Sequence, residues 1–257
     1  MRTSLLLTAA VVVVACTKET PPPPAPVTTP ATAAPKGRAG KVTLLITGHE
    51  TGQLVDKAPR LLAQWRRDEQ WPDALAFSTG DTFSGAALSS HFDGKSTAEV
   101  LLALQYKASA FGNHDLDLGP EAFRAFRDAS EVVYLAGNLK DASDTPLKLE
   151  AARVFSRDDV KVGVLGFTSE KTLTTVVSGR SAGLSLVPLA EAFPAALEQL
   201  KKEKPDVILA LIDDCFTALQ PYGNGKVDLV VGTRCDGAQE ATGTKTQYFS
   251  VGDDVSD

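Results

Sequence analysis

The fold of this chain is decided by one short stretch, Phe111-Gly112-Asn113-His114-Asp115-Leu116-Asp117-Leu118-Gly119. A short apolar run precedes it, and Pro120 behind it suits the first turn of a helix. Within a few residues the stretch offers an amide oxygen, an imidazole and carboxylates, which are groups that bind metal ions. Such side chains between a strand and a helix predict an α/β scaffold with its chemistry on loops at the strand ends.

The rest of the chain repeats this arrangement of apolar runs with polar ends. Five further β-rich runs end in glycine or polar residues, within residues 42–52, 74–85, 160–167, 205–213 and 227–236. Between them lie amphipathic stretches with helical spacing, notably residues 56–67 and 189–202. The alternation predicts strands and helices of the α/β class.

Two motifs connect the chain with a known family. Gly80-Asp81-Thr82-Phe83-Ser84-Gly85 follows one apolar run, and the Asn-His-Asp block follows the next. With the order of the other blocks, they resemble the catalytic domain of bacterial 5'-nucleotidases, a branch of the calcineurin-like metallophosphoesterases. The resemblance begins at about Lys41 and implies a four-layer α/β/β/α sandwich. It also implies phosphoester hydrolysis by two divalent metals, which hold the attacking and leaving oxygens.

Four residues match functional positions of that family. By resemblance, Asp81 corresponds to the bridging metal ligand and Asn113 to a second ligand that also lies near the phosphate. His114 matches the histidine that stabilises the transition state, and Asp117 the carboxylate that orients it. An imidazolium held by a carboxylate suits this task because negative charge grows on the phosphoryl oxygens during transfer.

The other ligand positions of the family hold different residues here. His49 stands where the family has an aspartate, and Asp213, Arg234 and Asp236 stand where it has histidines. His49 and the two aspartates can still bind a divalent cation, and carboxylate-rich sites favour Mg²⁺, Mn²⁺ or Ca²⁺. Arg234 cannot bind a metal, but a guanidinium matches the geometry of phosphate.

These replacements leave two hypotheses. In the first, the domain is non-catalytic or strongly divergent, with a degenerate metal site, and acts as a binding or scaffold domain that holds one divalent metal or none. In the second, His49, Asp81 and Asp236, with Thr51 as a candidate fourth ligand, hold one divalent metal, and the site hydrolyses generic phosphoesters. In either case Arg234 is expected to replace the second metal, to neutralise neighbouring carboxylates such as Asp213, and to contact a phosphate or phosphoester together with Asn113.

The N-terminus carries targeting signals. Residues 1–15 have a basic start and an apolar stretch, as in a signal peptide, and Val13-Val14-Ala15-Cys16 looks like a lipobox. We therefore expect a lipid on Cys16, which would anchor the protein to a membrane. Residues 16–40 form a Pro-rich tether, and residues 41–257 form the domain. Thr17, not an aspartate, follows the cysteine, which suggests an envelope lipoprotein on the periplasmic side of the outer membrane.

Two cysteines, Cys215 and Cys235, lie just past predicted strands and beside replaced ligand positions. If those strands are neighbours as in the family, the sulfurs could form a disulfide, which export permits. The alternative is two unrelated buried thiols, and the spacing of the cysteines in the sequence does not decide between a disulfide and free thiols.

Composition narrows the possible partners. The formal net charge is −6, and the domain contains no basic cluster, so nucleic acid is not an expected partner. The family has a second domain that stacks on nucleotide bases, and we expect it to be missing here, because few residues follow the last block; generic phosphoesters are therefore the expected ligands. The sequence names no protein partner.

Overall fold

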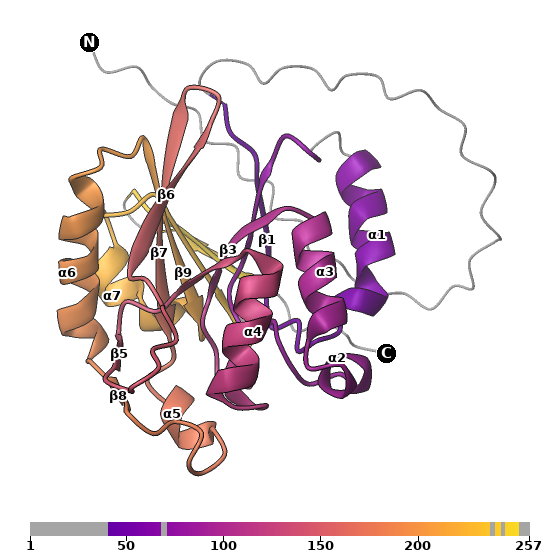
Figure 1. Cartoon of the computed structure of the whole chain (residues 1–257). Helices are drawn as coiled ribbons and strands as arrows, with labels where there is room; N and C mark the ends of the chain where they lie inside the picture. The colour runs from indigo at the N-terminus through magenta and orange to yellow at the C-terminus, as the bar shows by residue number, and fades with distance from the viewer. Residues whose placement is uncertain (1–40, 68–70, 237–239, 243–244, 252–257) are drawn as a thin grey trace.

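The computed structural model describes residues 41–67, 71–236, 240–242 and 245–251. The predicted signal peptide, the tether and Cys16 lie outside these residues. Within the described residues, no helix is both long enough and apolar enough to cross a membrane. Figure 1 shows two sheets at the centre of the molecule, with helices on both sides.

The N-terminal half forms a parallel sheet with helices on its outer face. Its strands pair in chain order and are β1 (Leu44–Thr47), β2 (Leu75–Ser78), β3 (Tyr106–Ala110) and β4 (Val133–Leu135). The connections contain α1 (Leu54–Arg67), α2 (Ala87–His91), α3 (Lys95–Ala103), the 3₁₀ helix η1 (His114–Leu116) and α4 (Pro120–Ser130). Parallel neighbours need such crossovers, so the polar ends of successive strands meet at one edge.

The C-terminal half forms a mixed sheet in the order β11-β12-β10-β9-β7-β6. Its strands are β6 (Ala152–Arg157), β7 (Val160–Thr168), β9 (Val207–Asp213), β10 (Leu229–Thr233), β11 (Glu240–Thr242) and β12 (Gln247–Val251). The four central strands run parallel, and the two edge strands run antiparallel to their neighbours. β9 is buried at every position, as expected for a continuous apolar run covered on both faces.

Short elements connect the two halves and cover the second sheet. β5 (Leu139–Asp141) pairs with β8 (Leu184–Leu186) in a small ribbon near α5 (Thr172–Thr175). α6 (Leu189–Lys201) packs on the second sheet through Phe193, Leu197 and Leu200, which share one helical face. η2 (Phe216–Ala218) and α7 (Gln220–Gly223) follow β9.

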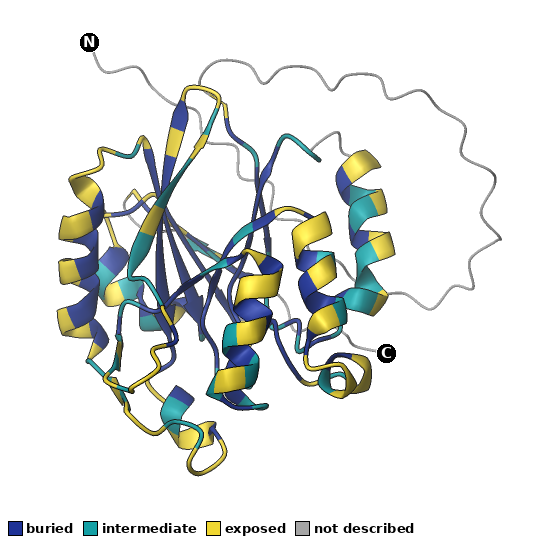
Figure 2. Cartoon of the chain, in the orientation of Figure 1, coloured by how far each residue is buried: buried dark blue, intermediate teal, exposed yellow. Residues whose placement is uncertain are grey.

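Three apolar layers hold the four structural layers together. One lies between α1, α3, α4 and the first sheet and includes Trp65, Leu101 and Phe123. The second joins the facing sides of the two sheets, and the third lies under α6. The strands are largely buried while the outer helix faces are exposed (Figure 2). The predicted four-layer α/β/β/α sandwich is therefore confirmed.

Candidate functional site

The candidate site lies where the C-terminal ends of strands from both sheets meet. His49, Asp81 and His114 follow β1, β2 and β3 of the first sheet. Asp213 is the last residue of β9, and Arg234 follows β10 of the second sheet. Loops 32 to 153 residues apart in sequence are thus joined by direct side-chain contacts.

Asp81 is the centre of the site. Its carboxylate is fully buried, and its Oδ2 accepts hydrogen bonds from His49 Nδ1 at 2.9 Å and from Arg234 Nη1 at 3.1 Å. Its Oδ1 accepts one from the backbone N–H of His114 at 2.8 Å. Burial alone would raise the pKa of Asp81, but the bond from His49 and the positive charge of Arg234 outweigh it and lower that pKa. Asp81 is therefore an ionised carboxylate that ties three loops together.

Asp213 is a second buried carboxylate beside it. Its Oδ2 lies 3.0 Å from Arg234 Nη2, but that nitrogen donates its hydrogen bond to the Asp213 backbone oxygen at 2.8 Å. Within the part of the chain that the structure describes, neither carboxylate oxygen of Asp213 accepts a hydrogen bond. Burial, followed by the nearby charge of Asp81, raises the pKa of Asp213 well above its ordinary value. Both carboxylate oxygens of Asp213 can therefore still accept a hydrogen bond or bind a metal ion in the site.

Two glycines leave room for these carboxylates to approach. A Cβ on Gly112 would come within 2.1 Å of Asp81 Oδ1 and 2.6 Å of Asp213 Oδ2. A Cβ on Gly80 would lie 2.8 Å from Asp213 Cβ. Gly80 and Gly112 therefore allow the two carboxylates to come close, because a glycine has no side chain to block them.

The backbone is unusual where the functional side chains are attached. His49, Asp81 and Arg234 adopt left-handed conformations, with φ of 51°, 56° and 55°. Such conformations are uncommon for residues other than glycine and cost of order 1–3 kcal/mol each. Strain of this kind concentrates at functional sites, where the surrounding structure maintains it.

One group of residues has the donors for a metal ion. Ligand atoms of His49, Asp81 and Asp213 all lie within 4.8 Å of one another. An imidazole nitrogen and two carboxylates suit a single divalent cation, and the Asp213 carboxylate oxygens, which accept no hydrogen bond from the described residues, support the fit. The guanidinium of Arg234 contacts both carboxylates and competes for them. These three residues offer donors for one ion.

The predicted metal residues are only partly brought together. Asp213 joins His49 and Asp81, whereas Asp236 is exposed and belongs to no such group among the described residues. Asp236 comes after Cys235, whose position is tied to Cys215, and its side chain remains at the surface. In the structure, Asp213 therefore takes the place that the sequence analysis gave to Asp236 in the one-metal set. Asn113 is half-buried next to His114.

His114 and Asp117 form the pair expected from sequence. His114 Nδ1 lies 2.6 Å from Asp117 Oδ2, which also accepts a hydrogen bond from Ser84 Oγ at 2.7 Å. Burial would lower the pKa of His114, but the bond to Asp117 and the charge of Asp81 outweigh it and raise that pKa. A protonated His114 presents Nε2–H as a donor. Its ring lies 5.9 Å from that of His49, measured between centroids, and its side chain is 34% exposed.

Two buried acids that sequence reasoning did not assign support the site loops. Asp115 accepts hydrogen bonds from the backbone N–H groups of Thr82, Phe83 and Gly112, and burial followed by the charge of Asp81 raises its pKa to about 7. The position of Asp115 inside the Asn-His-Asp block was the one feature of the sequence that could have indicated a role in the site.

The second acid is Glu50, next to His49. Its carboxylate accepts hydrogen bonds from Thr47 Oγ1 and from Ser78 Oγ, and Ser78 Oγ in turn accepts one from the backbone N–H of Gly80. Burial raises the pKa of Glu50 above its ordinary value. Glu50 therefore links the ends of β1 and β2 beneath His49 and Asp81, and nothing in the local sequence predicts this burial.

Cys215 and Cys235 form a disulfide, with Cα atoms 4.7 Å apart. Of the two alternatives left by the sequence, the bridge is the one found. It joins the segments that follow β9 and β10, and so connects the neighbours of Asp213 and Arg234.

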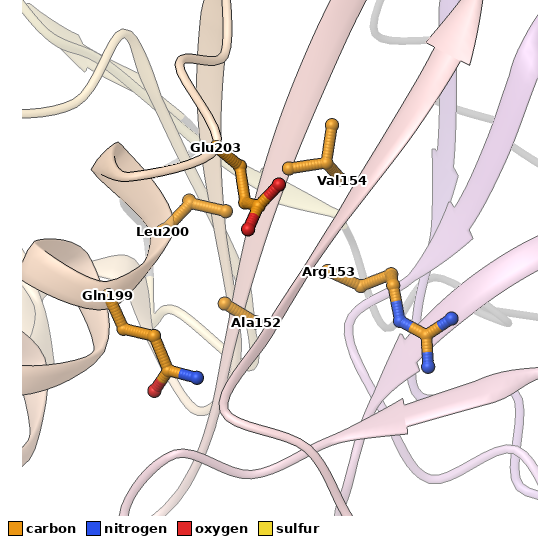
Figure 3. A pocket seen from close by; sticks show the side chains of 6 residues that line it. All are labelled: Ala152, Arg153, Val154, Gln199, Leu200 and Glu203. Carbon is orange, nitrogen blue, oxygen red and sulfur yellow. The ribbon is translucent and has the colours of Figure 1, made fainter.

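A separate groove lies between β6 and α6 (Figure 3). It is lined by Ala152, Arg153, Val154, Gln199, Leu200 and Glu203. Arg153 makes an exposed ion pair with Glu150, and none of the predicted site residues borders the groove. The groove therefore adds no residue to the candidate site.

Comparison with known proteins agrees with the motifs. No family model matches the chain. The chain is 26% identical over 211 residues to a 5'-nucleotidase of Vibrio cholerae and 27% identical over 210 residues to the protein UshA of Salmonella pullorum. Each alignment covers 77% of this chain but only 37% of the relative, so the chain spans well under half the length of these proteins.

Solved structures show the same architecture. A 5'-nucleotidase precursor from Thermus thermophilus aligns with a TM-score of 0.67 and 18% identity, over 82% of this chain and 48% of that one. The calcineurin-like phosphoesterase YfkN from Bacillus subtilis aligns with a TM-score of 0.59 and 17% identity, over 77% and 72%. At these identities the structures support the fold, and the sequence matches support the branch. Together they show that the chain is similar in sequence to bacterial 5'-nucleotidases and shares its fold with calcineurin-like phosphoesterases.

Proposed function

We propose that this domain binds a phosphate or phosphoester at the Asp81 site without two-metal hydrolysis, and that a lipid on Cys16 anchors it to the bacterial envelope. The observation that carries the first part is the position of Arg234. Its two terminal nitrogens lie 3.1 Å from Asp81 Oδ2 and 3.0 Å from Asp213 Oδ2. One guanidinium thus neutralises two carboxylates that could otherwise bind metal ions.

The exposed side of the site has donors for an anion. Arg234 is 28% exposed, so part of its guanidinium remains accessible, and this group matches phosphate oxygens in geometry. His114 adds an Nε2–H when it is protonated, which its raised pKa favours. Asn113, in the same loop, can contribute amide contacts. These groups support recognition of a phosphate whose remaining substituent is unspecified.

The alternative is a phosphoesterase with one metal. The grouping of His49, Asp81 and Asp213 within 4.8 Å favours it. These three residues would hold the ion, which would supply Lewis-acid stabilisation of phosphoryl oxygens. His114 would donate a hydrogen bond to the same oxygens, and Asp117 would keep its imidazole oriented. In this alternative Arg234 has to leave both carboxylates, because its guanidinium already contacts them.

Binding and turnover measurements separate the two. Isothermal titration with inorganic phosphate is expected to detect binding without added metal, weakened at least about tenfold in Arg234→Ala, which corresponds to about 1.4 kcal/mol. Arg153→Ala is the control for loss of an arginine, because Arg153 is exposed and contacts none of the site residues. Hydrolysis of p-nitrophenyl phosphate with Mn²⁺, lost in Asp81→Ala, would favour the one-metal enzyme. Absence of both phosphate binding and turnover would refute both.

The anchor is tested separately. Labelled palmitate is expected to enter the wild-type protein in bacterial cells but not Cys16→Ser, and the labelled protein should fractionate with the outer membrane. An unlabelled wild-type protein, or label in the inner membrane alone, would contradict the respective part of the proposal.

A further inference from the structure

We infer that the Cys215–Cys235 disulfide controls whether the site holds the Arg234 guanidinium or a divalent cation. This inference rests on the proposed function, in which Arg234 takes the place of a metal. It adds a redox control of the same site, exerted through the backbone segments that carry Asp213 and Arg234.

The bridge acts next to the residue that it controls. Cys235 directly follows Arg234, and Cys215 lies two residues after Asp213. On the other side of Arg234, the backbone N–H of Thr233 donates to the Asp214 oxygen at 2.8 Å. The backbone around Arg234 is therefore held on both sides, by a hydrogen bond and by a covalent bond.

The two segments are in close backbone contact at this point. A Cβ on Gly232 would lie 2.3 Å from the Asp214 oxygen and 2.5 Å from the Phe216 nitrogen. The end of β10 thus packs directly against the chain that follows Asp213. With the disulfide closed, the segment carrying Arg234 has little freedom to withdraw from the two carboxylates.

The conformation of Arg234 depends on this support. Its φ of 55° is in the left-handed region, which an arginine rarely adopts without constraints from its surroundings. The ion pairs with Asp81 and Asp213 hold the side chain, and the disulfide holds the backbone. Opening the bridge removes the second constraint and lets the residue relax to a common conformation, in which the guanidinium leaves the carboxylates.

The vacated position then suits a cation. Without Arg234, the buried carboxylates of Asp81 and Asp213 lack a neutralising charge, and the oxygens of Asp213 accept no hydrogen bond from the described residues. His49 completes the donor group. A divalent cation can bind only in molecules from which Arg234 has withdrawn, so its apparent dissociation constant varies inversely with the fraction of such molecules.

The redox step is an ordinary thiol–disulfide exchange. A dithiol reductant attacks one sulfur of the bridge, forms a mixed disulfide, and is itself oxidised to a disulfide when its second thiol displaces the other sulfur. Two electrons and two protons pass to Cys215 and Cys235, which become thiols. Both cysteines are half-buried, so the bridge is not sealed in the core.

Manganese binding to the full-length protein tests the inference. Electron paramagnetic resonance of free Mn²⁺ measures affinity for the oxidised wild type, the reduced wild type after removal of reductant under anaerobic conditions, and the Cys215→Ser/Cys235→Ser double variant. Circular dichroism verifies that each form is folded. If bridge opening raises the fraction of open sites tenfold, the affinity of the two bridge-free forms rises about tenfold. Asp213→Asn should weaken binding in every form.

Arg234→Ala distinguishes this inference from the proposal on which it rests. In that variant Mn²⁺ is expected to bind tightly in both redox states, because the competing cation is absent. Tight binding to Arg234→Ala combined with equal affinities of oxidised and reduced wild type would refute the redox control and leave the role of Arg234 intact. Weak binding to Arg234→Ala in both states would overturn the exchange of Arg234 for a metal, and with it this inference.

Discussion

Removal of the Arg234 side chain is the most informative perturbation of this protein. In Arg234→Ala, Asp81 and Asp213, which are both fully buried in the wild type, lose the cation that lies 3.1 Å and 3.0 Å from them. The disulfide and the rest of the fold remain. The variant therefore isolates the contribution of one guanidinium to a site that holds two buried carboxylates.

The expected loss of stability follows from burial. Breaking a buried ion pair by removing one partner costs about 3–5 kcal/mol. Arg234 is 28% exposed, and the raised pKa of Asp213 allows that residue to take up a proton, so the lower end applies, about 3 kcal/mol. For a domain of this size, that loss corresponds to a fall in Tm of about 6–12 °C.

Thermal unfolding with and without metal is the assay. Mn²⁺ at about 100 times its dissociation constant should restore about 2.7 kcal/mol to Arg234→Ala, because it binds only the folded state. Oxidised wild type should gain much less, since Arg234 occupies the position. Arg153→Ala is the matched control, because its exposed ion pair with Glu150 is worth only about 0–1 kcal/mol.

Two results would refute this reasoning. An Arg234→Ala protein with the Tm of the wild type would mean that the guanidinium does not compensate the buried charges. Equal stabilisation of wild type and variant by Mn²⁺ would mean that Arg234 and the metal do not compete for one position.

Three further changes test other parts of the site. Gly112→Ala should destabilise the fold by about 1–3 kcal/mol in chemical denaturation, because its Cβ would come 2.1 Å from Asp81 Oδ1; unchanged stability would contradict this packing. The pKa of Asp115 is raised from 3.8 to about 7, so the folded state holds this proton more tightly than the unfolded state does. The free energy of unfolding of the wild type should therefore fall as the pH rises from about 4 to about 7, and its pH dependence, measured by chemical denaturation, should be flatter in Asp115→Asn. Phosphate affinity should fall as pH rises through the raised pKa of His114, and titration calorimetry should find this fall at lower pH in Asp117→Asn; an unshifted profile would exclude the pair from binding.

Much of the fold was accessible from the sequence because its signals are local. The apolar runs predicted the main strands, and their polar ends predicted where His49, Asp81 and Asp213 would lie. The helix expected over residues 189–202 is found at Leu189–Lys201, because its apolar spacing directly specifies the face that packs on a sheet. Burial of isolated acids was not accessible. Glu50 and Asp115 are buried because neighbouring loops pack over them, and the residues next to them in the sequence do not encode this packing.

By itself, then, the sequence determined the α/β class, the resemblance to 5'-nucleotidases and the strand ends that carry the Asn-His-Asp block, since strand and helix periodicity and short motifs are properties of neighbouring residues. The tertiary structure decided that Asp213 rather than Asp236 joins His49 and Asp81, and that Cys215 meets Cys235. It also decided that Arg234 contacts an aspartate 153 residues away. These outcomes depend on distances of a few ångströms between loops far apart in the sequence, and such distances are set by strand pairing within a sheet and by how the two sheets pack against each other.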